Sequence, residues 1–175
     1  MNNQLKQCFF IILMVIGHIA SGQTQGNAKI YGYKEPVSRG ASPQETIDEN
    51  GNKISTTGSQ AFNYFIYLVS PGRVYPSEMW LNGQPYAVSV ETISQTPVER
   101  KNFNNPGDLS TTELVPATNQ KVIRLKPVPA IDDKLSTKGR RLSEDHELVV
   151  MYKLNGKFYF GTLKNLAILE AAALQ

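Results

Sequence analysis

The sequence has 175 residues and a formal net charge of +3, with 18 basic and 15 acidic side chains. A net charge this small argues against nucleic acid or a membrane surface as the partner. One cysteine and two histidines exclude a disulfide framework and supply too few ligands for a zinc centre of recognisable spacing. We therefore expect no metal and no cofactor.

Residues 1–22 have the pattern of a cleavable secretory signal peptide. Lys6 supplies a lone positive charge, the apolar run Cys8–Ile16 follows, and the small residues Ala20–Gly22 precede the expected cleavage. A transmembrane helix needs about 20 apolar residues, and Gly17–His18 interrupts this run well before that length. We predict an exported protein that is periplasmic, outer-envelope-associated or extracellular, with no membrane span after cleavage.

Cleavage after Gly22 would remove Cys8, His18 and one positive charge. We predict a flexible tail at 23–28 and a single β-rich domain at 29–175. A chain of about 150 residues buries roughly 68–70% of its unfolded surface. A core without disulfides is therefore large enough to hold this domain together.

Short extended segments and turn residues follow the leader. A first strand is expected at 29–33, and the stretch 35–60 is rich in Pro, Gly, Ser, Thr and Asn, which predicts a long loop. Residues 62–69 are mostly β-branched and aromatic, a pattern typical of a central strand covered on both faces.

A first hairpin is predicted around Asn82–Gly83, because this dipeptide favours the two-residue turn between antiparallel strands. The turn pairs Trp80 with Pro85 and places them on the mostly polar face, pointing outward. Proline lacks an N–H, which suits an edge strand. The other face is expected to join the core and consists of Met79, Leu81, Tyr86, Val88 and Val90.

Trp80 and Pro85, with the nearby Arg73 and Tyr75, form the candidate partner-binding set. Aromatic rings on a β surface provide a large contact area at low entropic cost, and so suit sugars or protein partners. The alternative is that the long polar segment 126–145 covers Trp80, which then belongs to the core. Loops of that length are usually functional or disordered.

A second hairpin is predicted around Asn155–Gly156. Its register gives two apolar faces, which are Val149, Met151, Phe158 and Phe160 on one side, and Leu148, Val150, Tyr152, Leu154, Tyr159 and Leu163 on the other. Residues 164–174 are good helix formers, and a short C-terminal helix is expected to cover one face. A face left uncovered would bind a partner.

Short strands separated by turns, without alternation of strand and helix, indicate a mainly β fold. We expect an antiparallel β-sandwich of immunoglobulin-like architecture with the short C-terminal helix. A small β-barrel is the alternative.

The exported chain offers little for catalysis. His146 lies among acidic residues and could serve a small hydrolase with a carboxylate, but a solvated position at the entry to a strand is the simpler interpretation. We assign no catalytic residue. The sequence favours a non-enzymatic exported binding or accessory protein, whose partner is another envelope or secreted protein. A carbohydrate-binding module is the first alternative, and a hydrolase using His146 is the second.

Overall fold

The structure is a computed structural model of the whole chain. The residues that it describes are 28–37, 45–47, 53–55, 61–101, 110–129 and 135–170. The predicted signal peptide and all but the last residue of the predicted tail lie outside them.

The described residues are mainly β, with one short helix, α1 (Thr137–Leu142). The main sheet contains β1 (Lys29–Pro36), β4 (Phe62–Ser70), β5 (Val74–Leu81), β6 (Gln84–Ile93), β9 (Lys121–Pro129), β10 (Leu148–Leu154), β11 (Lys157–Leu163) and β12 (Ala167–Ile168). Two separate hairpins are β2 (Glu45–Ile47) with β3 (Lys53–Ser55), and β7 (Val98–Lys101) with β8 (Thr111–Val115).

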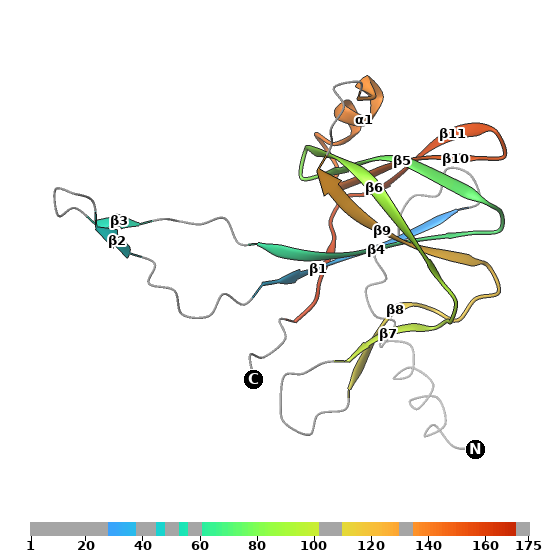
Figure 1. Cartoon of the computed structure of the whole chain (residues 1–175), viewed down its shortest axis with the longest axis horizontal. Helices are drawn as coiled ribbons and strands as arrows, with labels where there is room; N and C mark the ends of the chain where they lie inside the picture. The colour runs from blue at the N-terminus through green and yellow to red at the C-terminus, as the bar shows by residue number, and fades with distance from the viewer. Residues whose placement is uncertain are drawn as a thin grey trace, which may run out of the picture.

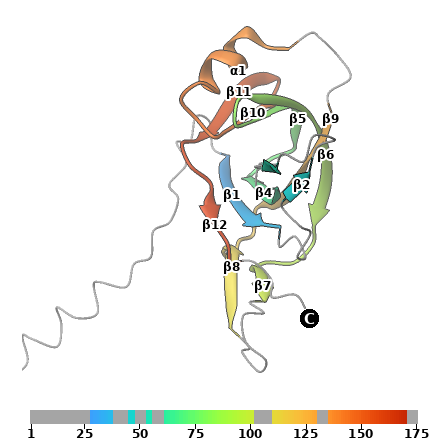
Figure 2. The same ribbon diagram turned by 90° about the vertical axis from the view of Figure 1, so that its left-hand side faces the viewer.

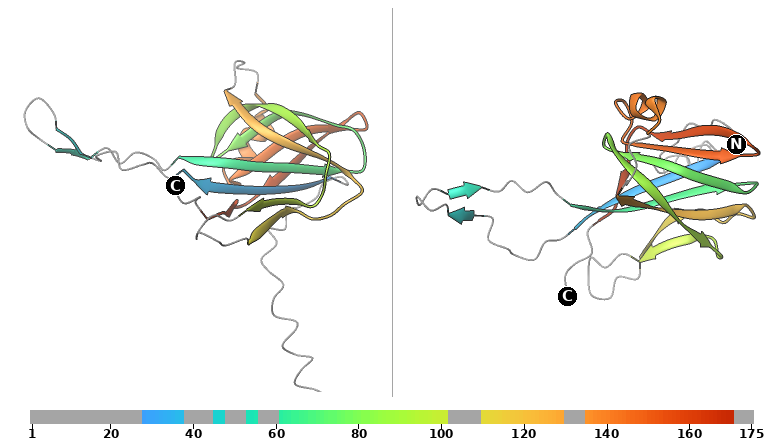
Figure 3. Two further views of the ribbon diagram at one scale, coloured as in Figure 1. Left: turned by 60° about the horizontal axis from the view of Figure 1, so that its bottom comes forward. Right: turned by 45° about the horizontal axis from the view of Figure 1, so that its top comes forward.

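The main sheet has the strand order β11-β10-β5-β6-β9-β4-β1-β12. Its neighbours are antiparallel except β1 and β12, which run parallel, so the sheet is mixed. The sheet curls into a half-barrel (Figures 1 and 2), and β1 and β4 lie side by side in its wall (Figure 3). A sandwich needs two facing sheets. The single curled sheet is therefore not a clear immunoglobulin-like sandwich, and its curvature is closer to the barrel alternative.

The inside of the half-barrel holds the main core. Because side chains alternate along a strand, each strand sends every second side chain into this interior. The buried members are Ala28, Ile30, Ile66, Leu68, Met79, Leu81, Ile123, Leu125, Leu148, Val150, Tyr152, Leu154, Leu163 and Leu166. Removal of this apolar surface from water is the main stabilising contribution.

A second, smaller cluster lies apart from the main core. It includes Tyr31 and Tyr67 from the sheet and Leu114 and Val115 from the β7–β8 hairpin. The hydroxyl of Tyr33 donates a hydrogen bond of 2.8 Å to the carbonyl of Leu114. This hairpin therefore covers part of the sheet that would otherwise be exposed.

Both predicted hairpin registers are confirmed. Trp80 pairs with Pro85 in the first, and Leu154 pairs with Lys157 in the second. Each turn has an asparagine followed by a glycine at positive φ, with values of 49° and 76° in the first turn and 50° and 82° in the second. Positive φ at both central residues is the signature of the type I′ turn that asparagine and glycine favour.

The first hairpin is not at an edge of the sheet, because β5 lies between β10 and β6. Pro85 is accommodated without a missing hydrogen bond, since β6 begins to pair with β9 only at Tyr86. Proline lacks only the donor on its own nitrogen. The sequence therefore correctly predicted that no strand bonds to the nitrogen of Pro85, but the prediction of an edge strand is wrong.

The predicted C-terminal helix is wrong within the described residues. Ala167–Ile168 forms strand β12, and the amide of Leu169 donates a hydrogen bond of 2.8 Å to the carbonyl of Lys34. Leu166 packs into the main core and Leu169 into the second cluster. Burial of these two leucines on different sides outweighs the helix propensity of the segment.

The two predicted long loops are shorter than expected. Strand β1 extends to Pro36, and strands β2 and β3 lie within 35–60. In the second stretch, β9 extends to Pro129 and α1 contains the basic cluster 138–141. The polar segment 126–145 was expected to be a loop, whereas it contains this short helix, which is capped by Ser136 and Ser143.

Candidate functional site

The four predicted partner-binding residues lie in two separate places. Trp80 and Pro85 pair beside the Asn82–Gly83 turn. Arg73 directly precedes β5 and Tyr75 is its second residue, at the opposite end of that strand. The structure therefore brings together the members of each pair but does not join the two pairs into one surface.

Trp80 is buried, so the outward, solvent-facing position predicted for it is wrong. Its side chain is 2% exposed, and helix α1 covers it. A Cβ atom at Gly139 of the helix would lie only 2.7 Å from Nε1 of Trp80. The alternative stated from the sequence, a cover supplied by residues 126–145, is the arrangement found.

Glu78 attaches this helix to the sheet. Its buried carboxylate accepts a hydrogen bond from Nε1 of Trp80 through one oxygen, and one of 3.0 Å from the amide of Ser136 through the other. The Ser136 hydroxyl in turn accepts a hydrogen bond of 3.1 Å from the amide of Gly139 and caps the helix. These contacts give Trp80 a structural role.

A β-bulge turns Tyr75 onto the outer face of the sheet. Between β5 and β10 the register shifts, because Met151 pairs with Glu78 whereas Tyr152 pairs with Pro76. Ser77 is therefore the extra residue, and bulges of this kind re-aim side chains. Because of this extra residue, the side chain of Tyr75 points to the same face of the sheet as those of Glu78 and Trp80. In a regular strand, Tyr75 and Glu78 would point to opposite faces.

Tyr75 begins an exposed row that crosses three strands. The register places it opposite Lys153 of β10, which lies opposite Phe158 of β11. Residues directly opposite in antiparallel strands share a face, so all three side chains point outward. Tyr75 is 53% and Phe158 is 62% exposed. We call this surface, with Arg73, Phe160 and Lys138, the cation–aromatic row.

Each ring of the row has a cation over it. The Arg73 guanidinium lies 5.1 Å from the centroid of Tyr75, and the Lys153 ammonium lies 5.7 Å from that of Phe158. A cation at these distances is attracted by the ring quadrupole. The side chain of Lys138 on α1 lies 5.1 Å from the ring of Phe160 in the same way.

The sequence indicated part of this row. The sequence places Phe158 and Phe160 on one face of the second hairpin. In the structure this is the outer face of the sheet, and Phe158 of β11 is exposed there. Arg73 and Tyr75 were chosen as neighbours of Trp80. Nothing in the sequence indicated that Lys138 belongs to the row, because its contact with Phe160 depends on how α1 packs against the sheet.

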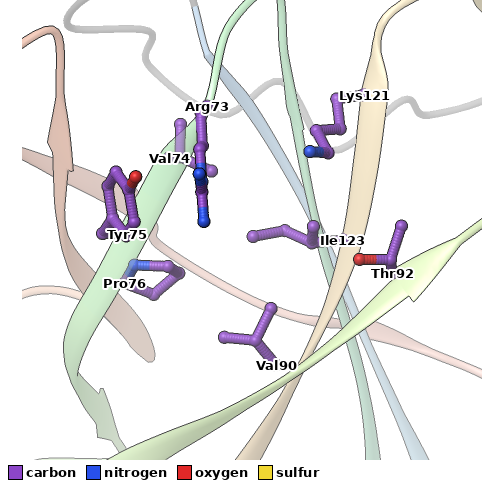
Figure 4. A pocket seen from close by; sticks show the side chains of 8 residues that line it. All are labelled: Arg73, Val74, Tyr75, Pro76, Val90, Thr92, Lys121 and Ile123. Atoms are coloured by element: carbon purple, nitrogen blue, oxygen red, sulfur yellow. The ribbon is translucent and has the colours of Figure 1, made fainter.

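A second feature of this region is an opening between β5 and β6. The two strands pair from Met79 to Leu81 and then diverge. Figure 4 shows the side chains around a cavity of about 290 Å³ in the space between them. The cavity is lined by Arg73, Val74, Tyr75, Pro76, Val90, Thr92, Lys121 and Ile123. Val90, predicted as a core residue, lies here and is 46% exposed.

His146, the histidine considered for a hydrolase, contacts the end of a helix. Its Nδ1 atom lies 2.9 Å from the carbonyl oxygen of Leu142, the last residue of α1. The adjacent acid Glu147 instead accepts hydrogen bonds from Lys34 and from the amide of Leu166. The contacts of both residues connect structural elements.

Among the described side chains, no group of three or more His, Cys, Asp or Glu residues is placed to hold a metal ion. Over the same part of the chain, the structure has no helix with the length and hydropathy needed to span a bilayer. Comparisons with protein-family models, curated proteins and solved structures find no match to this chain.

Proposed function

We propose that this chain is an exported, non-enzymatic binding protein that uses the cation–aromatic row to hold another envelope or secreted protein. The observation that carries the proposal is that Tyr75 and Phe158 are exposed on one face, with Lys153 between them. Export is supported by the leader pattern of residues 1–22.

The composition of the row suits a protein interface. Aromatic residues and arginine are enriched at interfaces, because they combine large contact area with few rotatable bonds. The rings of Tyr75 and Phe158 would provide the contact area. The three cations, Arg73, Lys138 and Lys153, would provide orientation and speed of encounter.

The charge of the row defines the partner further. The charged groups of Arg73, Lys138 and Lys153 lie against aromatic rings, and no ion pair joins them to a carboxylate of the described residues. We therefore propose that the partner presents an acidic surface. Complementary charges across an interface suppress wrong partners and raise the association rate.

The test is affinity purification from the envelope and secreted fractions of the native cell, using three versions of the full chain. The parent and Ile168→Ser should recover the same protein, because Ile168 is 69% exposed on β12, outside the row. Phe158→Ser should recover it at least tenfold less. Equal recovery by Phe158→Ser and the parent, or recovery of no specific protein by any version, would overturn the proposal.

A carbohydrate is the second candidate ligand, and the exposure of Tyr75 and Phe158 on one face favours it. Sugars stack on the faces of aromatic rings, but here a cation lies over each ring. We therefore rank a neutral sugar below an acidic protein. The test is a glycan array. Binding of the parent chain to a neutral glycan, with no binding of Phe158→Ser, would place a sugar above an acidic protein as the ligand.

A further inference from the structure

The divergence of β5 and β6 leaves two strand edges facing an open wedge. On its other side β6 pairs with β9 over the whole length from Tyr86 to Ile93. Toward β5 its pairing ends at Tyr86, so residues 87–93 have no strand partner on that side among the described parts of the chain. An unpaired row of N–H and C=O groups is a template for another extended chain.

The two edges are not equally suited to accept a strand. β5 has Pro76, which lacks an N–H, and the bulge at Ser77, which interrupts a regular ladder. β6 has no proline between Tyr86 and Ile93, and its pairing with β9 keeps one register throughout. The edge of β6 is therefore the one that can form regular backbone hydrogen bonds.

The residues that line the wedge indicate which chemical groups a bound extended chain would have. The apolar side chains of Val74, Val90 and Ile123 form part of the lining of the wedge. Two cations, Arg73 and Lys121, are among the described residues that line it, and no carboxylate is. Figure 4 shows the side chain of Arg73, the residue before β5, extending into the space between β5 and β9. Charge complementarity therefore favours an anionic group in this cavity.

We propose that the wedge binds an extended peptide with a free carboxylate, which adds to the open edge of β6. Backbone hydrogen bonds to β6 would give affinity, as in other cases of β-strand addition. An apolar side chain would enter the cavity between Val74 and Val90, and the carboxylate would lie between Arg73 and Lys121. This site shares Arg73 and Tyr75 with the cation–aromatic row, and its other lining residues lie outside the row.

The test uses a synthetic library of linear octapeptides with free C-terminal carboxylates, selected on the immobilised full chain and identified by mass spectrometry. Selected peptides are then measured by calorimetry against Lys121→Ser and Thr92→Trp. The first variant removes a cation from the cavity, and the second fills the wedge. Ile168→Trp is the matched control, because Ile168 is 69% exposed on β12, away from both the edge of β6 and the cavity.

We expect selected peptides to bind at least tenfold more weakly to Lys121→Ser and to Thr92→Trp, and to bind Ile168→Trp as tightly as the parent. Replacing the terminal carboxylate with an amide, or methylating alternate backbone nitrogens, should weaken binding similarly. Failure to select any peptide, or equal affinity for the parent and both variants, would overturn the proposal. Far-ultraviolet circular dichroism establishes that each variant is folded. If Phe158→Ser binds the peptides as tightly as the parent, peptide binding does not depend on the ring of Phe158 in the cation–aromatic row.

Discussion

At the scale of single residues, the position of the sole tryptophan depends on one acidic side chain. Glu78 is buried and accepts hydrogen bonds from Trp80 and from the backbone of Ser136, so one carboxylate joins strand and helix. Buried polar groups are expensive unless they are hydrogen-bonded. The close approach of helix and sheet also requires Gly139, which faces both Glu78 and Trp80.

Gly139→Ala should displace the helix and uncover the tryptophan. The added Cβ would lie 2.6 Å from a carboxylate oxygen of Glu78, and overpacking of this kind costs about 1–3 kcal/mol. Because Trp80 is the only tryptophan, its fluorescence reports directly on this site and should shift to longer wavelength. Gly72→Ala is the control, since a Cβ there meets Leu154 at an ordinary 3.5 Å. A parent-like spectrum and stability for Gly139→Ala would contradict this account of the helix.

Tyr33 predicts a loss of stability in alkaline solution. Burial raises the pKa of its hydroxyl from 10.0 to about 12. A group whose pKa is higher in the folded state contributes stability that is complete below the unfolded pKa and is lost as pH rises through the folded pKa. The free energy of unfolding should therefore fall between pH 10 and about pH 12. Urea titrations across this range should give a shallower decline for Tyr33→Phe, and an identical slope would contradict the assignment.

At the scale of elements, the two asparagine–glycine hairpins and one bulge determine which side chains face outward. The turns fix the register of β5 with β6 and of β10 with β11. The bulge at Ser77 then turns Tyr75 to the outer face, opposite Lys153. The cation–aromatic row therefore depends on register, since a shift of one residue would send its side chains inward.

Gly156→Ala tests the turn of the second hairpin. Gly156 has a φ of 82°, and a Cβ atom at this position would meet nothing within 4 Å, so the change adds backbone strain without a clash. A left-handed conformation costs a non-glycine residue roughly 1–2 kcal/mol. Chemical denaturation should show a loss of about this size, whereas the exposed neighbour Lys157→Ala should stay within about 0.5 kcal/mol of the parent. Equal stabilities would mean that this turn does not hold the conformation described.

Features that depend on neighbouring residues could be predicted from the sequence, whereas features that depend on contacts between distant residues could not. Both hairpins were predictable because asparagine–glycine turns act through neighbouring residues. The burial of Trp80 under residues 126–145 was one of two alternatives, and local pattern could not decide between them because the cover comes from Gly139, far along the chain. The segment after Lys164 was predicted as a helix on propensity, but Leu166 and Leu169 are buried in two different clusters. The strand order of the sheet was also not predictable, because it depends on pairing between strands far apart in the sequence, such as β5 with β10.

At the scale of the whole molecule, Glu147 holds together parts of the half-barrel that are distant in sequence. Its carboxylate accepts hydrogen bonds from Nζ of Lys34 at 2.6 Å and from the amide of Leu166 at 2.8 Å. Its own carbonyl accepts a hydrogen bond of 2.9 Å from the amide of Asn82. One residue thus connects β1, the first hairpin and the C-terminal segment.

Glu147→Ala should destabilise the whole domain. The change removes two charge-assisted hydrogen bonds and leaves the amide of Leu166 without its acceptor, a loss of roughly 1.5–3 kcal/mol. Glu91→Ala is the matched control, because its ion pair with Lys126 is half-exposed and such pairs contribute about 0–1 kcal/mol. Similar unfolding midpoints for the two variants would show that Glu147 has no special part in holding the half-barrel together.

The central claim is that the cation–aromatic row recognises an acidic partner, and a charge reversal tests it most directly. Lys153→Glu changes the cation between Tyr75 and Phe158, whereas Lys101→Glu makes the same change of charge on β7. The measurement is the affinity of each variant for the protein recovered by the parent chain. We predict at least a tenfold loss for Lys153→Glu and parent-like affinity for Lys101→Glu. Equal affinities for the two variants would contradict the claim.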